Sequence, residues 1–301
     1  MMKRNIFSAI LGMTLMTSVM SSCADESDEP NYTDISSDGR TAMEFTFSHP
    51  SQSRVTDTSF EQGDVVGLFV TDAELPLQIG GNTVNNVALT FTGSLWRTAH
   101  TLYWDAGTYN AYAYYPRIGS IESITDLPFE VKADQRRDST SSDADGYEAS
   151  DFLYASVSGI KASADPVNMR FSHILSQLKV RLIKGEDFVG DIPESTTVYI
   201  HNTVTEASID LEAGIATKAP RGHTGTIIAR QDSPSSYSAI VVPQRLDNRV
   251  PLVEVVMSGI SYMCESRLVL KPGMSHLISI VIDKNPDQIK IEIGAQRQDW
   301  Y

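Results

Sequence analysis

The sequence predicts an all-β protein, and three observations support this prediction. Apolar and polar residues alternate with a period of two in several segments, which is typical of strands with one buried and one solvated face. Glycine and proline interrupt the chain at short intervals, as hairpins and Greek-key connections require. No segment keeps a helical period for long. We therefore expect sheets that pack against one another around an apolar core.

The first element is a short hydrophobic segment. Lys3 and Arg4 precede an apolar run over residues 6–16, which is too short to span a bilayer. This arrangement predicts a secretory signal peptide over residues 1–22. Small residues lead from the run to Cys23, and the pattern resembles a bacterial lipobox. We expect lipidation of the Cys23 thiol, and ordinary cleavage that leaves a free cysteine is the alternative.

Residues 23–40 form the second element, which is polar and begins with an acidic tract. Such a tract cannot build a core, and repulsion between its charges keeps it extended, so we expect a tether. An acidic tract just after the lipidated cysteine resembles the surface-export signal of Bacteroidota lipoproteins. We therefore expect the mature protein on the cell outer membrane, facing outward, with the outer-membrane lipid as a partner through Cys23.

Several segments of the remaining chain alternate apolar and polar residues. They are Met43, Phe45 and Phe47; Tyr109 to Tyr115; Leu178 to Leu182; and Ile289, Ile291 and Ile293. The runs 239–242 and 278–282 have little or no polar interruption, which indicates central strands covered on both faces.

A division into two domains is expected over residues 41–173 and 174–301. The polar stretch 136–150 separates strand-like segments, but further strand-like segments follow it before any new start. We therefore interpret this stretch as a long surface loop inside the first domain. Each half would hold about seven strands, the size of a small sandwich.

Composition argues against several classes of function. The formal net charge of −14 disfavours nucleic acid as a partner, because both molecules would be negative. No nucleotide-binding, hydrolase or zinc-protease motif is present, and the six histidines show no metal-ligand spacing. We expect no catalytic residues, no cofactor and no metal. Cys264 lies in a strand-like segment and is expected to be a buried structural thiol.

Two features keep ligand binding open. The loop from Asp143 to Glu148 carries carboxylates of the kind that calcium prefers, although it departs from the EF-hand pattern, and a solvated acidic loop is the simpler interpretation. Aromatic residues crowd between Trp96 and Tyr115, with Trp104 among them. They could form a glycan platform, but cross-strand aromatic pairs also stabilise ordinary sheets.

A series of short motifs runs through the chain in a fixed order. They are Arg54-Val55-Thr56, Phe60 to Val70, Trp104, Tyr109 to Pro116, Ser150 to Ala155, Met169 to Leu178, Leu270 to Gly273, and Trp300. The series resembles the fimbrillin family of Bacteroidales, which includes Mfa-like and related cell-adhesion proteins. Two details depart from the family pattern: Val55 replaces the usual alanine, and Met274 to His276 lack the common aromatic residue.

The resemblance implies two transthyretin-like β-sandwich domains in tandem and a role as a type V pilus subunit or surface adhesin. It also implies that a protease cuts the lipoprotein precursor after an arginine and removes the first strand. A strand of the next pilus subunit then fills the exposed groove by β-strand addition. A stalk, tip or anchor role stays open. The alternative is a glycan-binding surface lipoprotein of a polysaccharide-use system.

The candidate cleavage sites are Arg40 and Arg54, which flank the segment with Met43, Phe45 and Phe47. Cleavage after Arg54 would release this strand, whereas cleavage after Arg40 would remove only the tether, so we favour Arg54. The donor strand is expected in residues 288–301 of another copy. Its pocket residues would be Ile289, Ile291 and Ile293, although their alternation also suits an ordinary edge strand. We further expect His173 to hold the domain junction through hydrogen bonds.

Overall fold

The computed structural model describes residues 39–50, 60–136, 146–283, 290–292 and 298–300. These residues form strands and turns with one short 3-10 helix, η1 (Glu148–Ser150), and no α-helix. Within the same ranges, no helix has the length and apolar character needed to cross a membrane. The predicted all-β class is therefore confirmed. Cys23, Arg54, Ile289 and Ile293 lie outside the described residues, as do positions 137–145 of the acidic loop.

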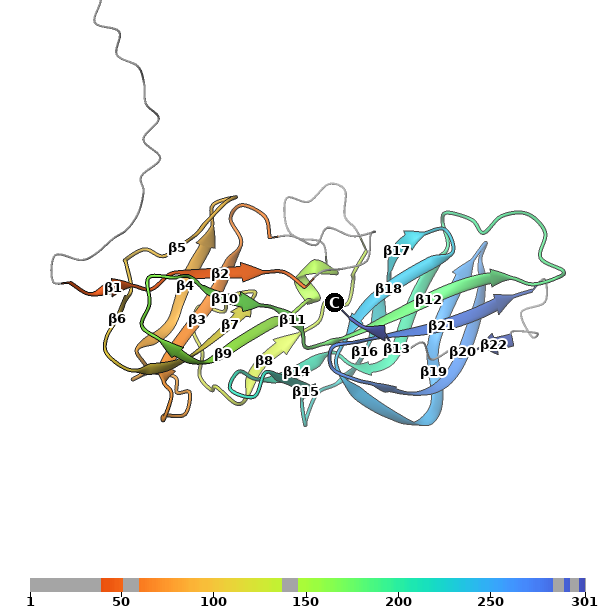
Figure 1. Ribbon diagram of the computed structural model, residues 1–301. Coiled ribbons are helices and arrows are strands. Elements are labelled where there is room, and N and C mark those ends of the chain that lie inside the picture. The colour runs from red at the N-terminus through yellow and green to blue at the C-terminus, as the bar shows by residue number, and fades with distance from the viewer. Residues whose placement is uncertain (1–38, 51–59, 137–145, 284–289, 293–297, 301) are drawn as a thin grey trace, which may run out of the picture. The chain divides into compact units, whose positions relative to one another are not determined.

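The first half of the chain builds a six-stranded sheet with the order β11-β9-β7-β3-β4-β5 (Figure 1). Two small sheets accompany it, in which β1 pairs with β6 and β2 pairs with β10. The strands are β1 (Thr41–Ala42), β2 (Phe45–Ser48), β3 (Val65–Asp72), β4 (Val84–Phe91), β5 (Trp96–Arg97), β6 (Tyr103–Trp104), β7 (Thr108–Tyr115), β9 (Leu153–Lys161), β10 (Val167–Arg170) and β11 (Ser172–His173).

The central strand β3 is buried on both faces. Leu68 packs in one apolar cluster together with Met43 and Phe45, whereas its neighbour Phe69 packs in a second cluster. A Cβ atom at Gly67 would lie 2.3 Å from the ring of Tyr114 on β7, so glycine lets this ring lie against the β3 backbone. The sheet thus separates two apolar layers, and the N-terminal strands belong to the first of them.

The second half contains two sheets, with the orders β17-β18-β12-β21-β22 and β16-β13-β19-β20, and β23 also pairs with β21. The strands are β12 (Ser176–Lys184), β13 (Thr197–Val204), β16 (Thr224–Ile228), β17 (Arg230–Ser233), β18 (Ser236–Val241), β19 (Gln244–Met257), β20 (Ile260–Leu270), β21 (Met274–Ile282), β22 (Lys290–Glu292) and β23 (Gln298–Asp299).

A small third sheet crosses the predicted domain boundary. Its order is β15-β14-β8, with β8 (Leu127–Glu130) from the first half and β14 (Glu206–Asp210) and β15 (Ile215–Lys218) from the second. The buried Gln135 side chain donates to the carbonyl oxygen of Ile240 at 2.8 Å and accepts from its N–H at 2.8 Å. The described residues fall in one compact unit, so the boundary at residue 173 stays a prediction.

Most of the expected strands are present. Alternating residues of β7 and β12 are buried, and the apolar runs lie in β18 and β21, which each have a strand on both sides. Within the predicted strand from Ile289 to Ile293, the structure describes Lys290–Glu292 as β22. The alternation predicts strands well because a pleated strand turns successive side chains to opposite faces.

Candidate strand-exchange site

The N-terminal strand β2 is held by one neighbour. It lies beside β10 in parallel, with Phe45 opposite Val167 and Phe47 opposite Met169 (Figure 1). The N–H of Val167 donates to the carbonyl oxygen of Glu44 at 2.8 Å, and the N–H of Phe171 donates to that of Ser48 at 3.0 Å. No other described strand pairs with β2. Its backbone is therefore attached through a single short ladder.

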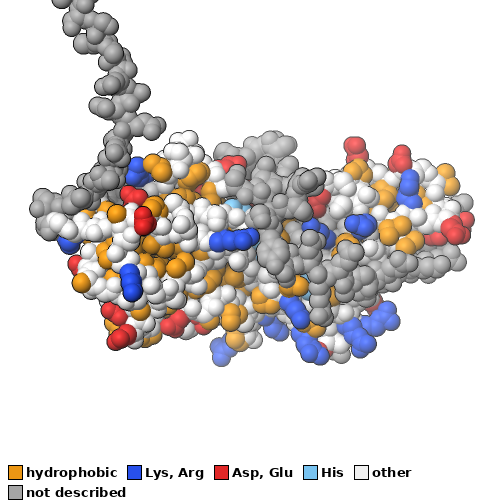
Figure 2. Space-filling model, viewed as in Figure 1, with side chains coloured by type: hydrophobic (Ala, Val, Ile, Leu, Met, Phe, Trp, Pro, Cys, Tyr) orange, Lys and Arg blue, Asp and Glu red, His pale blue; other side chains and the backbone are white. Residues whose placement is uncertain are grey.

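The side chains of this segment enter the first apolar cluster. Met43 and Phe45 are 8% and 7% exposed, and Phe47 is half-buried. The Phe45 ring lies 6.2 Å from that of Trp104, and the Phe47 ring lies 5.0 Å from that of Trp96 in an edge-on arrangement. Figure 2 shows hydrophobic side chains gathered over this part of the surface. The predicted inward face of the segment is thus present in the structure.

Arg40 precedes the strand and is exposed, with its guanidinium 5.0 Å from the centre of the Tyr103 ring. It lies before both β1 and β2, so a cut after Arg40 would leave these strands in the chain. Position 54 follows β2 along the sequence, so a cut there would separate both strands from the rest. The choice between the two arginines stays a prediction.

The expected donor segment is paired within its own chain. Ile291 lies in β22, opposite Ile280 of β21, and β23 pairs with the start of β21. In this state the described residues Lys290–Glu292 form the edge strand of their sheet. A donor role would require it to leave β21, and that role stays a prediction.

A polar and aromatic cluster closes the end of β2. The buried His173 binds Asp151 through Nδ1 at 3.0 Å, and its ring stacks on that of Trp300 at 3.8 Å between centres. The ring of His49, just after β2, lies 5.1 Å from that of Phe60 and 6.1 Å from that of His173. Burial lowers the pKa of His49. The bond to Asp151 lies within the predicted first domain, so the role expected of His173 at the domain junction stays a prediction. Its stacking on Trp300 had no sequence signal.

The aromatic residues considered as a glycan platform mostly serve the core. Trp104, Tyr109 and Tyr114 are buried, at 3%, 5% and 1% exposure. The half-buried Trp96 packs against Phe47 and Phe60. Three of these rings are therefore unavailable to a sugar, and the structural interpretation of this cluster holds for them.

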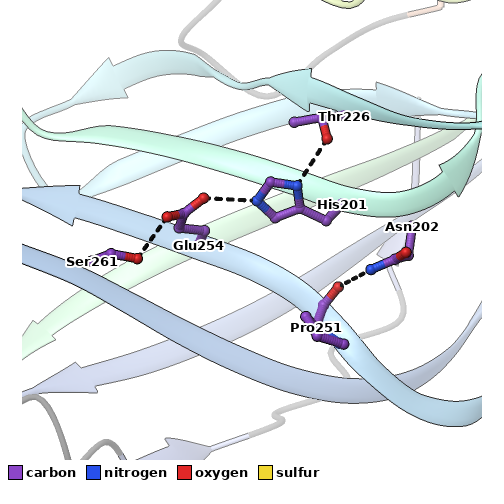
Figure 3. Close-up of polar contacts among 6 residues, drawn as sticks. All are labelled: His201, Asn202, Thr226, Pro251, Glu254 and Ser261. Atoms are coloured by element: carbon purple, nitrogen blue, oxygen red, sulfur yellow. Dashed lines mark hydrogen bonds and ion pairs between the residues drawn. The ribbon is translucent and has the colours of Figure 1, made fainter.

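A polar chain in the second half links His201, Glu254, Ser261 and Thr226 (Figure 3). His201 Nε2 lies 2.9 Å from Glu254, and the Ser261 hydroxyl donates to Glu254 at 2.6 Å. The bond from Ser261, followed by that from His201, lowers the pKa of Glu254. Because Ser261 donates to the carboxylate and not to the imidazole, the serine–histidine contact of nucleophilic catalysis is not formed.

Cys264 and a cavity beside β8 are two other candidate sites. Cys264 is 2% exposed, and burial raises the pKa of its thiol to about 11, which agrees with a structural role. A cavity of about 590 Å³ lies beside β8 and β14, with Phe129, Glu130, Glu206 and His223 among its lining residues. Sequence spacing could not indicate this cavity, because β8 and β14 are far apart in the chain. Among the described residues, no group of acids, histidines and cysteines could hold a metal ion.

Comparison with known proteins identifies the family. The model of the family described as Fimbrillin-like matches residues 53–300, which is most of the chain. The chain belongs to the fimbrillin-like family. The resemblance expected from the sequence motifs is thereby confirmed. A comparison with curated proteins finds no match.

Solved structures of similar fold come from species of Bacteroides and from Porphyromonas gingivalis. A candidate cell adhesion protein of Bacteroides ovatus is 19% identical, with a TM-score of 0.69, and the match covers 87% of this chain and 98% of that one. A candidate cell adhesion protein of Bacteroides uniformis is 20% identical, with a TM-score of 0.66 and coverage of 88% and 100%. The tip fimbrial protein Mfa3 of Porphyromonas gingivalis is 8% identical, with a TM-score of 0.50 and coverage of 80% and 95%. These proteins are described as adhesion or fimbrial proteins and not as enzymes.

Proposed function

We propose that this fimbrillin-like chain is a fimbrial subunit or surface adhesin that is exported as a lipoprotein through Cys23 and assembled by strand exchange. Membership of the family supports the fimbrial role. The observation that carries the exchange mechanism is the attachment of β2, which has one strand partner but places Met43 and Phe45 in the core. We assign the chain no catalytic role.

Removal of β2 would expose apolar surface of the first cluster and the edge of β10. Burial of a large apolar side chain stabilises a protein by about 1.5–3 kcal/mol, so the loss of Met43, Phe45 and Phe47 would expose surface worth about 5 kcal/mol in total. The loss would also leave the β10 edge without its ladder. A strand with alternating apolar residues would cover both the apolar surface and the open edge. This gives assembly its driving force.

The C-terminal segment of another copy is our candidate for that strand. It alternates apolar and polar residues, and the structure describes three of its residues, Lys290–Glu292, as β22. Because β22 lies at the end of the strand order of its sheet, its release from β21 separates it from one neighbouring strand. The same segment could then pair with β10 of the next subunit.

The test compares two variants of the full-length protein, Arg54→Ala and the matched control Arg40→Ala. Each is treated with a trypsin-like protease, then examined on unboiled gels and by electron microscopy. We expect ladders and filaments for the wild type and for Arg40→Ala, and an uncut, folded monomer for Arg54→Ala. Ladders that persist in Arg54→Ala would exclude this cleavage site. A cut monomer that never polymerises would favour a tip or anchor role over a stalk role.

The lipid anchor has its own test. Cys23→Ala should release the protein into the soluble fraction, since the thiol that carries the lipid is lost. If this variant still fractionates with membranes, Cys23 is not the anchor.

A further inference from the structure

The strand β20 forms an edge of the sheet β16-β13-β19-β20. It is 11 residues long, and across the part of the chain that the structure describes, β19 is its sole strand partner. The free edge of such a strand presents unpaired N–H and C=O groups, which can pair with a further strand. This edge is formed by residues 260–270, whereas β2 and β10 are formed by residues 45–48 and 167–170.

The side chains of β20 alternate between a buried and an exposed face. Tyr262 and Cys264 are buried, whereas Met263 and Val269 are 44% and 43% exposed. Two charged residues, Glu265 and Arg267, lie between these two apolar residues on the same exposed face. The exposed face therefore reads apolar, acidic, basic, apolar along the strand.

The two charges have no partner on β19. Pro251 is the residue opposite Glu265, and the pairing of the two strands is irregular next to Arg267. Within the described ranges, neither charged side chain takes part in an ion pair. A strand added beyond the free edge could supply both partners.

A second copy of β20 fits this pattern. We propose that β20 pairs antiparallel with β20 of a second copy, about a two-fold axis at Ser266. In this register, Glu265 lies opposite the partner subunit's Arg267, and Arg267 lies opposite the partner subunit's Glu265. Met263 lies opposite the partner subunit's Val269. Directly opposite side chains of an antiparallel pair are about 4.5–5.5 Å apart at Cβ, so both charge pairs and both apolar pairs are in contact.

Neighbouring registers lose these pairs. An axis at Glu265 places this carboxylate opposite itself, and an axis at Arg267 does the same for the guanidinium. An axis at Cys264 places Met263 opposite a glutamate. Like charges directly opposite each other are destabilising, so the charges select the axis at Ser266. Such an isologous contact closes on itself as a dimer.

The polar chain in Figure 3 holds the start of this edge in place. Ser261 on β20 binds Glu254 on β19, which binds His201 on β13, which in turn contacts Thr226 on β16. The chain crosses all four strands of the sheet. Because these bonds hold β20 in the sheet, less conformational entropy is lost when a further strand pairs with it.

The first test is a charge swap in the full-length protein in detergent, with dimerisation measured by analytical ultracentrifugation. Glu265→Arg and Arg267→Glu each convert both charge pairs into like-charge contacts, so each should weaken the dimer by at least about tenfold. The double variant Glu265→Arg/Arg267→Glu should restore it to near the wild-type strength. Glu122→Arg, which changes an exposed loop by the same charge, is the control and should leave the dimer unchanged.

The second test fixes the register by cross-linking. A mixture of Met263→Cys and Val269→Cys proteins should form a disulfide-linked heterodimer, because these positions are opposite in the proposed pair. Either variant alone should not cross-link, since equal positions lie several residues apart. Circular dichroism confirms that each variant is folded.

Three results would overturn the proposal. The first is a wild type that stays monomeric and a mixture that gives no cross-link. The second is a dimer that Glu265→Arg does not weaken or that the double variant does not restore. The third is protection of the β20 amides from hydrogen exchange in dilute monomer, which would mean that the chain itself covers the edge. The proposal does not depend on strand exchange, because none of these variants touches β2.

Discussion

The strands β2 and β21 differ in how they are attached, although the sequence marks both by apolar residues. Strand β21 lies between β12 and β22 and is in register with β12 over eight residue pairs. Strand β2 is in register with β10 over four residue pairs and has no second partner among the described strands. Its attachment depends on the buried side chains of Met43 and Phe45 instead. An element held mainly by side chains can leave with few broken backbone bonds, yet it leaves a large apolar surface behind.

The largest expected effect comes from Phe45→Ala, which removes a buried ring from the first apolar cluster. We expect a loss of about 3–5 kcal/mol in the free energy of unfolding, measured by urea denaturation. Ser48→Ala on the same strand is the matched control, since Ser48 is exposed and should change stability by less than about 0.5 kcal/mol. Similar small losses in both variants would mean that the side chains of β2 do not hold it.

A smaller effect is expected at the cluster that closes the end of β2. Asp151→Ala removes the carboxylate that binds the buried His173 and should cost about 1–3 kcal/mol in the same experiment. Asp151→Asn keeps an acceptor oxygen and should cost less. If the two variants are equally stable, the hydrogen bond to His173 does not contribute to holding this end of the site.

Strand β21, which has a neighbour on both sides, provides the comparison with β2. Ile280→Val removes one methylene from a fully buried side chain of β21 and should cost about 0.5–1.5 kcal/mol. Because the backbone ladder to β12 remains, we expect protease-triggered assembly to proceed as in the wild type. Assembly that fails in this variant, while the monomer stays folded, would show that the two strands are not independent.

The smallest effect is a pH dependence at His49. Burial holds the folded pKa of His49 below the ordinary value of 6.5, so the unfolded state binds the proton more tightly. Stability should therefore fall as the pH drops below about 6.5. His49→Phe keeps a ring against Phe60 and should show a weaker fall between pH 7.5 and 5.5. An equal fall in both proteins would assign the pH dependence to other groups.

The sequence predicts which side chains of β2 face the core, but it does not predict which strand β2 pairs with. Alternation predicted that Met43 and Phe45 face a core, because the side-chain period of a strand is a local property. The pairing of β2 with β10, more than 100 residues later, depends on the folded arrangement and leaves no local signal. The stacking of His173 on Trp300 and the pairing of β8 with β14 escaped prediction for the same reason. Trp104 is a case in which the sequence suggested a role that the fold does not allow. The crowding of aromatic residues made it a candidate for sugar binding, but its side chain is buried.

Hydrogen exchange at the β10 edge tests most directly whether β2 is a replaceable strand. The N–H groups of Val167 and Phe171 donate to the carbonyl oxygens of Glu44 and Ser48 at the two ends of β2, so their exchange reports the presence of a strand in this place. We expect protection in the intact protein, loss of protection in freshly cleaved monomer, and recovery of protection in assembled filaments. Protection that stays unchanged after cleavage after Arg54, or that does not return on assembly, would contradict strand exchange at this site.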